Sequence, residues 1–169
     1  QLIARNPDAV GSNGMVVSSH ELASNLGVEI LKNGGNAIDA AIATGFALAV
    51  VHPGAGNIGG GGFMVIRLAD GAVKTIDFRE VAPSSGYRNM FLDDSLNVIE
   101  GKSWNTSWAS GVPGSVAGFG MAHEKYGSIK WKNLVKPAVK LAKEGFPLDF
   151  QNMLYLNDPY YADYLSNDI

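Results

Sequence analysis

The fold is decided by the stretch NGGNAIDAAIATGFALAVVHPGAGNIGGGGFMVI, residues 33–66. Asn36 is a good helix cap and Asp39 lies in the first turn, where a carboxylate favours the helix dipole, so a helix is predicted up to about Val51. This segment is apolar almost all round and rich in small residues. Such a pattern predicts a buried central helix without a solvent face. Its close packing is expected through Ala40, Ala41, Ala43 and Gly45, and His52-Pro53 should end it.

Glycine fills the next segment, with six glycines among the nine residues 54–62. A phosphate-binding loop would need Lys and Ser or Thr after its last glycine, but Phe63 follows Gly62 here. The dinucleotide-binding fingerprint follows a strand and opens a helix, whereas this segment follows a helix. Close backbone packing beneath a site is therefore favoured over nucleotide binding.

Upstream of residue 33, the sequence predicts a strand and a helix. Residues 15–17 are short, apolar and β-branched, which is typical of a buried strand. Ser18 and Glu21 have the spacing of a capping box, so a helix is expected from about Ser19 to Asn33.

Downstream of the glycines, residues 63–68 and 73–78 flank Asp70-Gly71, which predicts a hairpin with a two-residue turn. Residues 79–112 are expected to be mostly loop. Two further helices are predicted at about 113–126 and 131–144. Pro137 should kink the second of them or divide it into two shorter helices.

Composition limits the classes of function. The chain has 169 residues, a formal charge of −3 and no cysteine. The charge gives no basic footprint for nucleic acid, and the missing cysteines exclude disulfides, thiolate metal sites and a Cys nucleophile within the chain. No signal peptide or membrane-spanning run is visible, so the chain is expected to be soluble and to form one domain.

Candidate chemistry is sparse. An Arg at a strand end, such as Arg79, can grip a carboxylate through two parallel hydrogen bonds, but the residues alone favour a structural ion pair with Asp77 or Glu80. The three histidines share no metal-ligand spacing and are interpreted as structural or exposed: His20, His52 and His123. No serine-nucleophile motif occurs, and no metal or cofactor is indicated. A non-enzymatic module that binds a ligand through the glycine segment is a further hypothesis.

Several strings, in order over about residues 14–150, resemble the γ-glutamyltransferase (glutathione hydrolase) family. They are Gly-Gly-Asn-Ala-Ile-Asp-Ala-Ala at 34–41, the segment from His-Pro to Gly-Phe-Met at 52–64, Asp-Phe-Arg-Glu at 77–80, Gly-Val-Pro-Gly-Ser-Val-Ala-Gly at 111–118 and Leu-Ala-Lys-Glu-Gly-Phe at 141–146.

The resemblance implies an α+β fold, the αββα sandwich of the N-terminal nucleophile hydrolases. This chain would supply the N-terminal part of the large subunit, so residues 1–169 would form a single partial domain of it. In that family a precursor cuts itself, and the new N-terminal Thr of the small subunit attacks the γ-glutamyl carbonyl. Water or an acceptor amino acid then resolves the γ-glutamyl-enzyme ester.

For this chain, the resemblance implies binding and scaffold rather than chemistry. No catalytic residue is expected in it. Arg79 would bind the α-carboxylate of the γ-glutamyl donor, the partner would be the small catalytic subunit, and the isolated chain would be inactive. The family also implies a periplasmic or extracellular location. A γ-linked polyglutamate depolymerase and a cephalosporin acylase of the same superfamily are alternatives.

Overall fold

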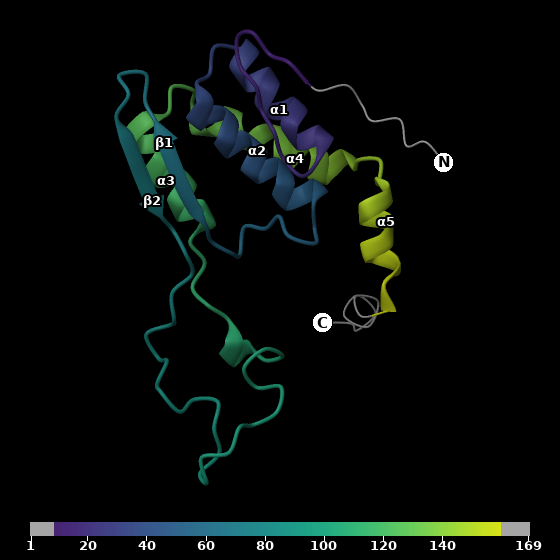
Figure 1. Ribbon diagram of the computed structural model, residues 1–169. Coiled ribbons are helices and arrows are strands. Elements are labelled where there is room, and N and C mark those ends of the chain that lie inside the picture. The colour runs from purple at the N-terminus through teal and green to yellow at the C-terminus, as the bar shows by residue number, and fades with distance from the viewer. Residues whose placement is uncertain (1–8, 160–169) are drawn as a thin grey trace. The chain divides into compact units, whose positions relative to one another are not determined.

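The computed structural model describes residues 9–159 (Figure 1). It contains helices and a small two-stranded sheet, which confirms the α+β class. The elements, in chain order, are α1 (Glu21–Lys32), α2 (Ala37–Val51), β1 (Phe63–Arg67), β2 (Val73–Asp77), the 3-10 helix η1 (Ser107–Ala109), α3 (Ser115–Tyr126), α4 (Trp131–Glu144) and α5 (Phe150–Asn157).

The chain forms two compact units. The first contains the described residues up to Gly56 and those from Tyr126 onward, and the second contains residues 57–125. The expectation of a single partial domain over 1–169 stays a prediction. Among the described residues, no helix is long and apolar enough to cross a membrane.

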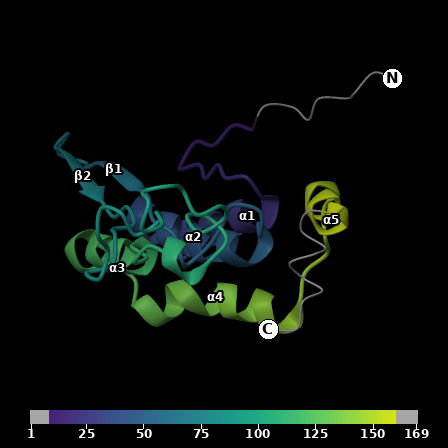
Figure 2. The ribbon, with the colours of Figure 1, turned by 90° about the horizontal axis from the view of Figure 1, so that it is seen from below.

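The core of the first unit is built on α2, which packs against both α1 and α4 (Figures 1 and 2). Its most buried apolar side chains, such as Ile42 and Ala47, have no exposed surface. On α4, Leu134 is fully buried, and Trp131 meets Phe46 of α2 edge to face at 5.5 Å between ring centroids. The prediction of a central helix is therefore confirmed.

The prediction that α2 has no solvent face is wrong in the described chain. Ala40 and Ala43 are buried as expected, but Ala41 is exposed and Gly45 is half-buried. Among the described residues, α1 and α4 make the main contacts with α2, and part of this apolar helix stays exposed.

Residues 15–17 do not form the predicted buried strand. They are extended but unpaired, and Met15 and Val17 are 52% and 82% exposed. A strand needs a partner for its backbone groups, and no described segment pairs with this one. Val16 instead lies against α1, where a Cβ at Gly27 would come within 2.8 Å of its Cγ1.

The cap of α1 is His20 and not Ser18, so the predicted capping box is wrong. The His20 Nδ1 accepts a hydrogen bond from the backbone N–H of Leu22 at 3.2 Å. Ser18 Oγ lies instead 2.8 Å from Ser24 Oγ. The other ring nitrogen of the buried His20 lies 3.5 Å from Oδ2 of Asp149, which itself caps α5. One imidazole thus links the beginnings of two helices.

The predicted end of the chain's longest amphipathic helix is confirmed. Helix α4 runs to Glu144, and Gly145 follows it with a positive φ of 78°. It passes through Pro137 as one helix, so the alternative of two shorter helices is wrong. The tyrosines and leucine of the tail at 160–165 lie outside the described residues.

The predicted cap of α2 at Asn36 is confirmed, and with Asp39 it forms a full capping box that was not predicted from the sequence. Asn36 Oδ1 accepts hydrogen bonds from the N–H groups of Ile38 and Asp39, and the Asp39 carboxylate accepts one from the N–H of Asn36 at 3.0 Å. The same carboxylate, which is fully buried, also accepts hydrogen bonds from both the N–H and the hydroxyl of Ser128 and from the N–H of Ile129. Asn36 adds a bond from its side-chain amide to the Tyr126 carbonyl at 2.6 Å.

These donors set the ionisation of Asp39. Burial by itself raises the pKa of the carboxyl, but the hydrogen bonds from the Ser128 hydroxyl and from the backbone of Asn36, Ser128 and Ile129 together lower it below its ordinary value of 3.8. The charged form is therefore the one that the fold stabilises.

The second unit contains the predicted hairpin, with β1 and β2 antiparallel and Phe63 opposite Asp77. Its turn is longer than predicted. Leu68 and Ala72 close it by a 2.8 Å hydrogen bond, which leaves three residues in the loop, and Gly71 takes a positive φ of 86°. Such a loop is the next commonest hairpin connection after the two-residue turn. Residues 79–112 are irregular apart from η1 and isolated bridges, as expected.

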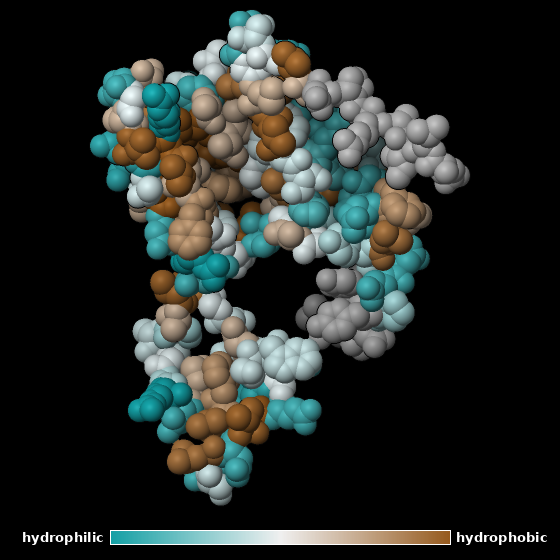
Figure 3. Space-filling view, in the orientation of Figure 1, coloured by the Kyte–Doolittle hydropathy of each residue, from teal (hydrophilic) through white to brown (hydrophobic). Residues whose placement is uncertain are grey.

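The two faces of the hairpin differ in exposure. Ile66 and Ile76 are buried on one face. The other face is open, with Phe63, Val65 and Val73 at 67%, 75% and 59% exposure. Figure 3 shows the apolar surface over the hairpin at the upper left of the view.

We expect Asp39→Asn to destabilise the protein by about 2–4 kcal/mol, because an amide cannot accept from all the donors that converge on the carboxylate. Thermal unfolding of the full-length protein should show a transition several degrees lower. Because the folded-state pKa lies below 3.8, the stabilisation by Asp39 is present above that pH and is lost as the pH falls through the folded value. The difference in unfolding temperature between wild type and Asp39→Asn should therefore become smaller below pH 3.8. Asp94→Asn, on an exposed loop, is the matched control and should leave the transition unchanged.

Candidate functional site

Arg79 lies two residues after the end of β2, in a segment whose backbone is held on both sides. Phe78 continues the hairpin by one pair, with its N–H donating to the Gly62 carbonyl at 3.0 Å. Val81 then pairs with Val112 through bonds of 3.3 and 2.8 Å. Arg79 and Glu80 lie between these two pairings, so their position is fixed by backbone hydrogen bonds although the region is formally a loop.

Three glycines allow this arrangement by their lack of a side chain. A Cβ at Gly61 would lie 2.5 Å from the Phe78 carbonyl oxygen, and one at Gly114 only 2.0 Å from it. A Cβ at Gly118 on α3 would lie 2.2 Å from Cγ of the Phe78 ring. The interpretation of the glycine segment as close backbone packing is therefore confirmed at Gly61.

The start of α3 is closed by protein rather than left open for an anion. The Gly60 carbonyl accepts hydrogen bonds from the N–H groups of Gly114 and Ser115 at 2.8 and 3.0 Å. A phosphate-binding loop would instead direct its free amides toward the ligand. The nucleotide interpretation of the glycine segment thus finds no support in its geometry.

The Arg79 side chain is 63% exposed and has neighbours on two sides. Its Nε lies 3.3 Å from Oε2 of Glu80, and its Cζ lies 5.9 Å from the centroid of the Phe63 ring. Its backbone N–H donates to Oδ1 of Asp77 at 3.0 Å. The ion pair expected with Asp77 or Glu80 is thus with Glu80, while Asp77 binds the backbone.

This ion pair does not consume the binding capacity of Arg79. An exposed ion pair is worth at most about 1 kcal/mol, and guanidinium carries five N–H donors in a planar fork. Among the described residues, Glu80 is the only carboxylate within ion-pair distance of Arg79. The group can therefore accept a second carboxylate with two parallel hydrogen bonds.

The histidines make no site together. His20 is a buried helix cap, and His52 ends α2, its carbonyl accepting from the N–H groups of Ala55 and Gly56. His123 lies on α3. In the part of the chain that the structure describes, no group of His, Asp and Glu side chains could hold a metal ion.

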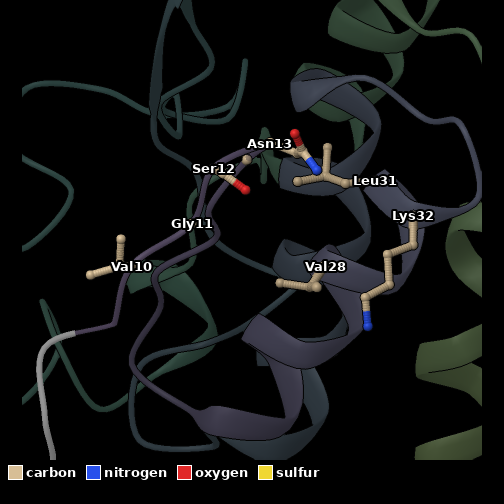
Figure 4. A pocket seen from close by; sticks show the side chains of 8 residues that line it. Val10, Gly11, Ser12, Asn13, Val28, Leu31 and Lys32 are labelled. Atoms are coloured by element: carbon tan, nitrogen blue, oxygen red, sulfur yellow. The ribbon is translucent and has the colours of Figure 1, made fainter.

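A cavity of about 480 Å³ lies between the N-terminal segment and α1 (Figure 4). Its one charged side chain, Lys32, is paired with Glu29 at 2.9 Å. It offers no convergent polar set for catalysis. The residues that line it are Val10, Gly11, Ser12, Asn13, Gly14, Val28, Leu31 and Lys32.

Comparison with known proteins identifies the family. The model of the family "Gamma-glutamyltranspeptidase" matches residues 23–166, most of the chain. The chain belongs to the γ-glutamyltranspeptidase family. With it comes the N-terminal nucleophile hydrolase fold, of which this chain carries a part.

Named relatives support the same assignment. The chain is 57% identical over 137 residues to a glutathione hydrolase proenzyme from Pseudomonas sp. strain A14, a match that covers 81% of this chain and 24% of that protein. It is 56% identical over 133 residues to the glutathione hydrolase proenzyme of Escherichia coli K12, covering 79% of this chain and 23% of that protein. The γ-glutamyltranspeptidase of Helicobacter pylori has a similar structure, with a TM-score of 0.86 and 50% identity over 90% of this chain and 44% of that one. The chain thus spans about a quarter of the length of these curated relatives.

Sequence reasoning missed the neighbour of Arg79 on β1. Phe63 was assigned only to a strand. The predicted two-residue turn at Asp70-Gly71 could not have indicated it, because that turn would place residue 63 opposite residue 78. Only the observed three-residue loop places Phe63 opposite Asp77, two positions before Arg79 and on the same face.

We expect Gly118→Ala to destabilise the protein by about 1–3 kcal/mol, since the new methyl group would overlap the Phe78 ring and force the segment that carries Arg79 to shift. Gly120→Ala, in the same helix, is the matched control. A Cβ there meets nothing within 4 Å, so this change should stabilise α3 by about 0.5–1 kcal/mol. Thermal unfolding of the two variants in the full-length protein measures the contrast, and equal shifts would contradict this account of the packing.

Proposed function

We propose that this chain is the N-terminal part of the large subunit of a γ-glutamyltransferase that transfers or hydrolyses the γ-glutamyl group of glutathione-like donors. The observation that carries the proposal is Arg79, which stands at the end of a fixed strand with an exposed guanidinium, in a chain of this family. A γ-linked donor keeps a free α-carboxylate, and a planar guanidinium recognises a carboxylate through two parallel bonds. The chain contributes binding and scaffold.

The chemistry lies with a small subunit cut from the same precursor. Its N-terminal Thr attacks the γ-carbonyl, with its own α-amine as base, and forms a γ-glutamyl ester. Backbone N–H groups of that subunit stabilise the oxyanion. Water or an acceptor amino acid then releases the γ-glutamyl group. Arg79 holds the far end of the donor during both steps and so sets the position of the γ-carbonyl. We place the enzyme in the periplasm or outside the cell, as the family resemblance implies.

The glycine segment does not favour the non-enzymatic alternative. The Gly60 carbonyl closes α3, and Gly61 packs against the backbone of Phe78 and Glu80. Polyglutamate depolymerase and cephalosporin acylase activities remain alternatives within the superfamily. Glutathione, poly-γ-glutamate and a glutaryl-cephalosporin, assayed side by side with the full-length protein, should rank glutathione first by kcat/KM.

Intact-mass spectrometry of the full-length protein tests the subunit arrangement. We expect two chains from one precursor, and the smaller should begin with Thr. Replacement of that Thr by Ala should leave a single uncut chain without activity. A protein that is active as one uncut chain would overturn the proposed mechanism.

We expect Arg79→Ala in the full-length enzyme to raise KM for a γ-glutamyl donor by about tenfold or more, because a bidentate charge-assisted contact is lost. Arg79→Lys should recover part of the affinity, since it keeps the charge but not the fork. Self-cleavage should be largely preserved in both variants, which separates donor binding from folding. An unchanged KM in Arg79→Ala would remove this residue from the site.

A further inference from the structure

Phe63 and Arg79 lie on the same open face of the hairpin. Phe63 is opposite Asp77 in the β-ladder, and Arg79 follows Asp77 by two residues, so the alternation of the strand directs both side chains to one side. The buried residues Ile66 and Ile76 mark the opposite face. The Cζ of Arg79 accordingly lies 5.9 Å from the centroid of the Phe63 ring, within the range of a cation–π contact.

The ring has no place in the apolar core of the described unit. Phe63 is 67% exposed, and the apolar packing of the hairpin lies on its other face. The centroid of its ring lies 5.9 Å from Cζ of the Arg79 guanidinium. Within the described unit, the contact of this ring is therefore with Arg79 and not with the buried face of the hairpin.

The two neighbours of Arg79 restrain different parts of the guanidinium. Glu80 approaches Nε at 3.3 Å, and the Phe63 ring lies beside the carbon at the centre of the group. An exposed Arg side chain otherwise loses rotamer entropy when a ligand orders it. Restraint before binding reduces that loss and leaves the edge formed by the two Nη groups for an incoming carboxylate.

We propose that Phe63 is a positioning residue for Arg79, whose ring preorganises the guanidinium so that its Nη edge receives the donor α-carboxylate. This inference rests on the proposed function and deepens it. It assigns to the first residue of β1 a part in donor affinity. The effect of Phe63 on the donor passes entirely through Arg79.

The test compares Phe63→Leu with the ring-retaining Phe63→Tyr and Phe63→Trp in the full-length, self-cleaved enzyme. Phe63→Leu should raise KM for a γ-glutamyl anilide by about two- to fivefold, the range of an exposed cation–π contact, with little change in kcat. The Tyr and Trp variants should keep KM near that of the wild type. Val65→Ala, at the next residue of β1 on the same open face, is the matched control and should leave KM unchanged.

Two further measurements separate positioning from packing. With a 4-aminobutyryl anilide, which lacks the α-carboxylate, Phe63→Leu should not change kcat/KM relative to wild type. In an Arg79→Ala background, Phe63→Leu should add no further rise in KM for the γ-glutamyl donor. Any of three results would overturn the inference. The first is an equal loss of kcat/KM on both donors, and the second is an additive rise in KM in the double variant. The third is a rise in KM for the Tyr and Trp variants as large as that for Phe63→Leu.

The outcomes also distinguish the two proposals. If Arg79→Ala leaves KM unchanged, the proposed role of Arg79 fails and that of Phe63 fails with it. If Arg79→Ala raises KM but Phe63→Leu does not, only the inference on Phe63 is overturned. If Phe63→Leu does not self-cleave, the KM values of the Tyr and Trp variants test the inference instead. The inference requires both to bind the donor as the wild type does, so a raised KM in either would overturn it.

Discussion

The first unit depends on one buried carboxylate. Asp39 accepts hydrogen bonds from the start of its own helix and from Ser128, 89 residues further along the chain. A buried charge without such partners would be strongly unfavourable, so the ionised side chain and its donors stabilise one another. The consequence is geometric. The first turn of α2 is fixed against the segment that leads into α4, and α2 can then pack against both α4 and α1.

In the second unit, a comparable constraint comes from side chains that are absent. The backbone of Phe78 and Arg79 passes so close to Gly61 and Gly114 that neither position could carry a methyl group without displacing it. Backbone pairings at 62–78 and 81–112 then hold the segment on both sides. The position of the Arg79 side chain is thus a property of rigid backbone, although it stands at the beginning of a long irregular segment. Ligand-binding groups are commonly carried in this way, on loops held by a fixed scaffold.

The sequence predicted the features whose causes are local. The helix cap at Asn36, the hairpin around Asp70-Gly71 and the end of α4 at Gly145 all follow from residues within a few positions of one another. It failed where a distant partner decides. Ser18 had the spacing of a cap, but His20 caps α1 and at the same time reaches Asp149, which no local pattern could indicate. The partnership of Asp39 with Ser128 was invisible for the same reason. Residues 15–17 have the composition of a strand, but a strand exists only where another strand can pair with it.

Arg79 shows how local and distant information combine. The residues alone favoured an ion pair, and the structure contains one, with Glu80. Only the family resemblance pointed to a carboxylate ligand, and the exposed fork is compatible with both roles at once. The open face beside it carries Phe63, Val65 and Val73, and a two-stranded hairpin with such a face is at most marginally stable by itself. A second layer over a sheet would bury such residues, and an αββα sandwich supplies that layer. In the proposed enzyme, the layer that covers the hairpin therefore also encloses Arg79. By excluding water, it strengthens the contact between Arg79 and a carboxylate. Donor affinity then depends on the assembly of the two subunits.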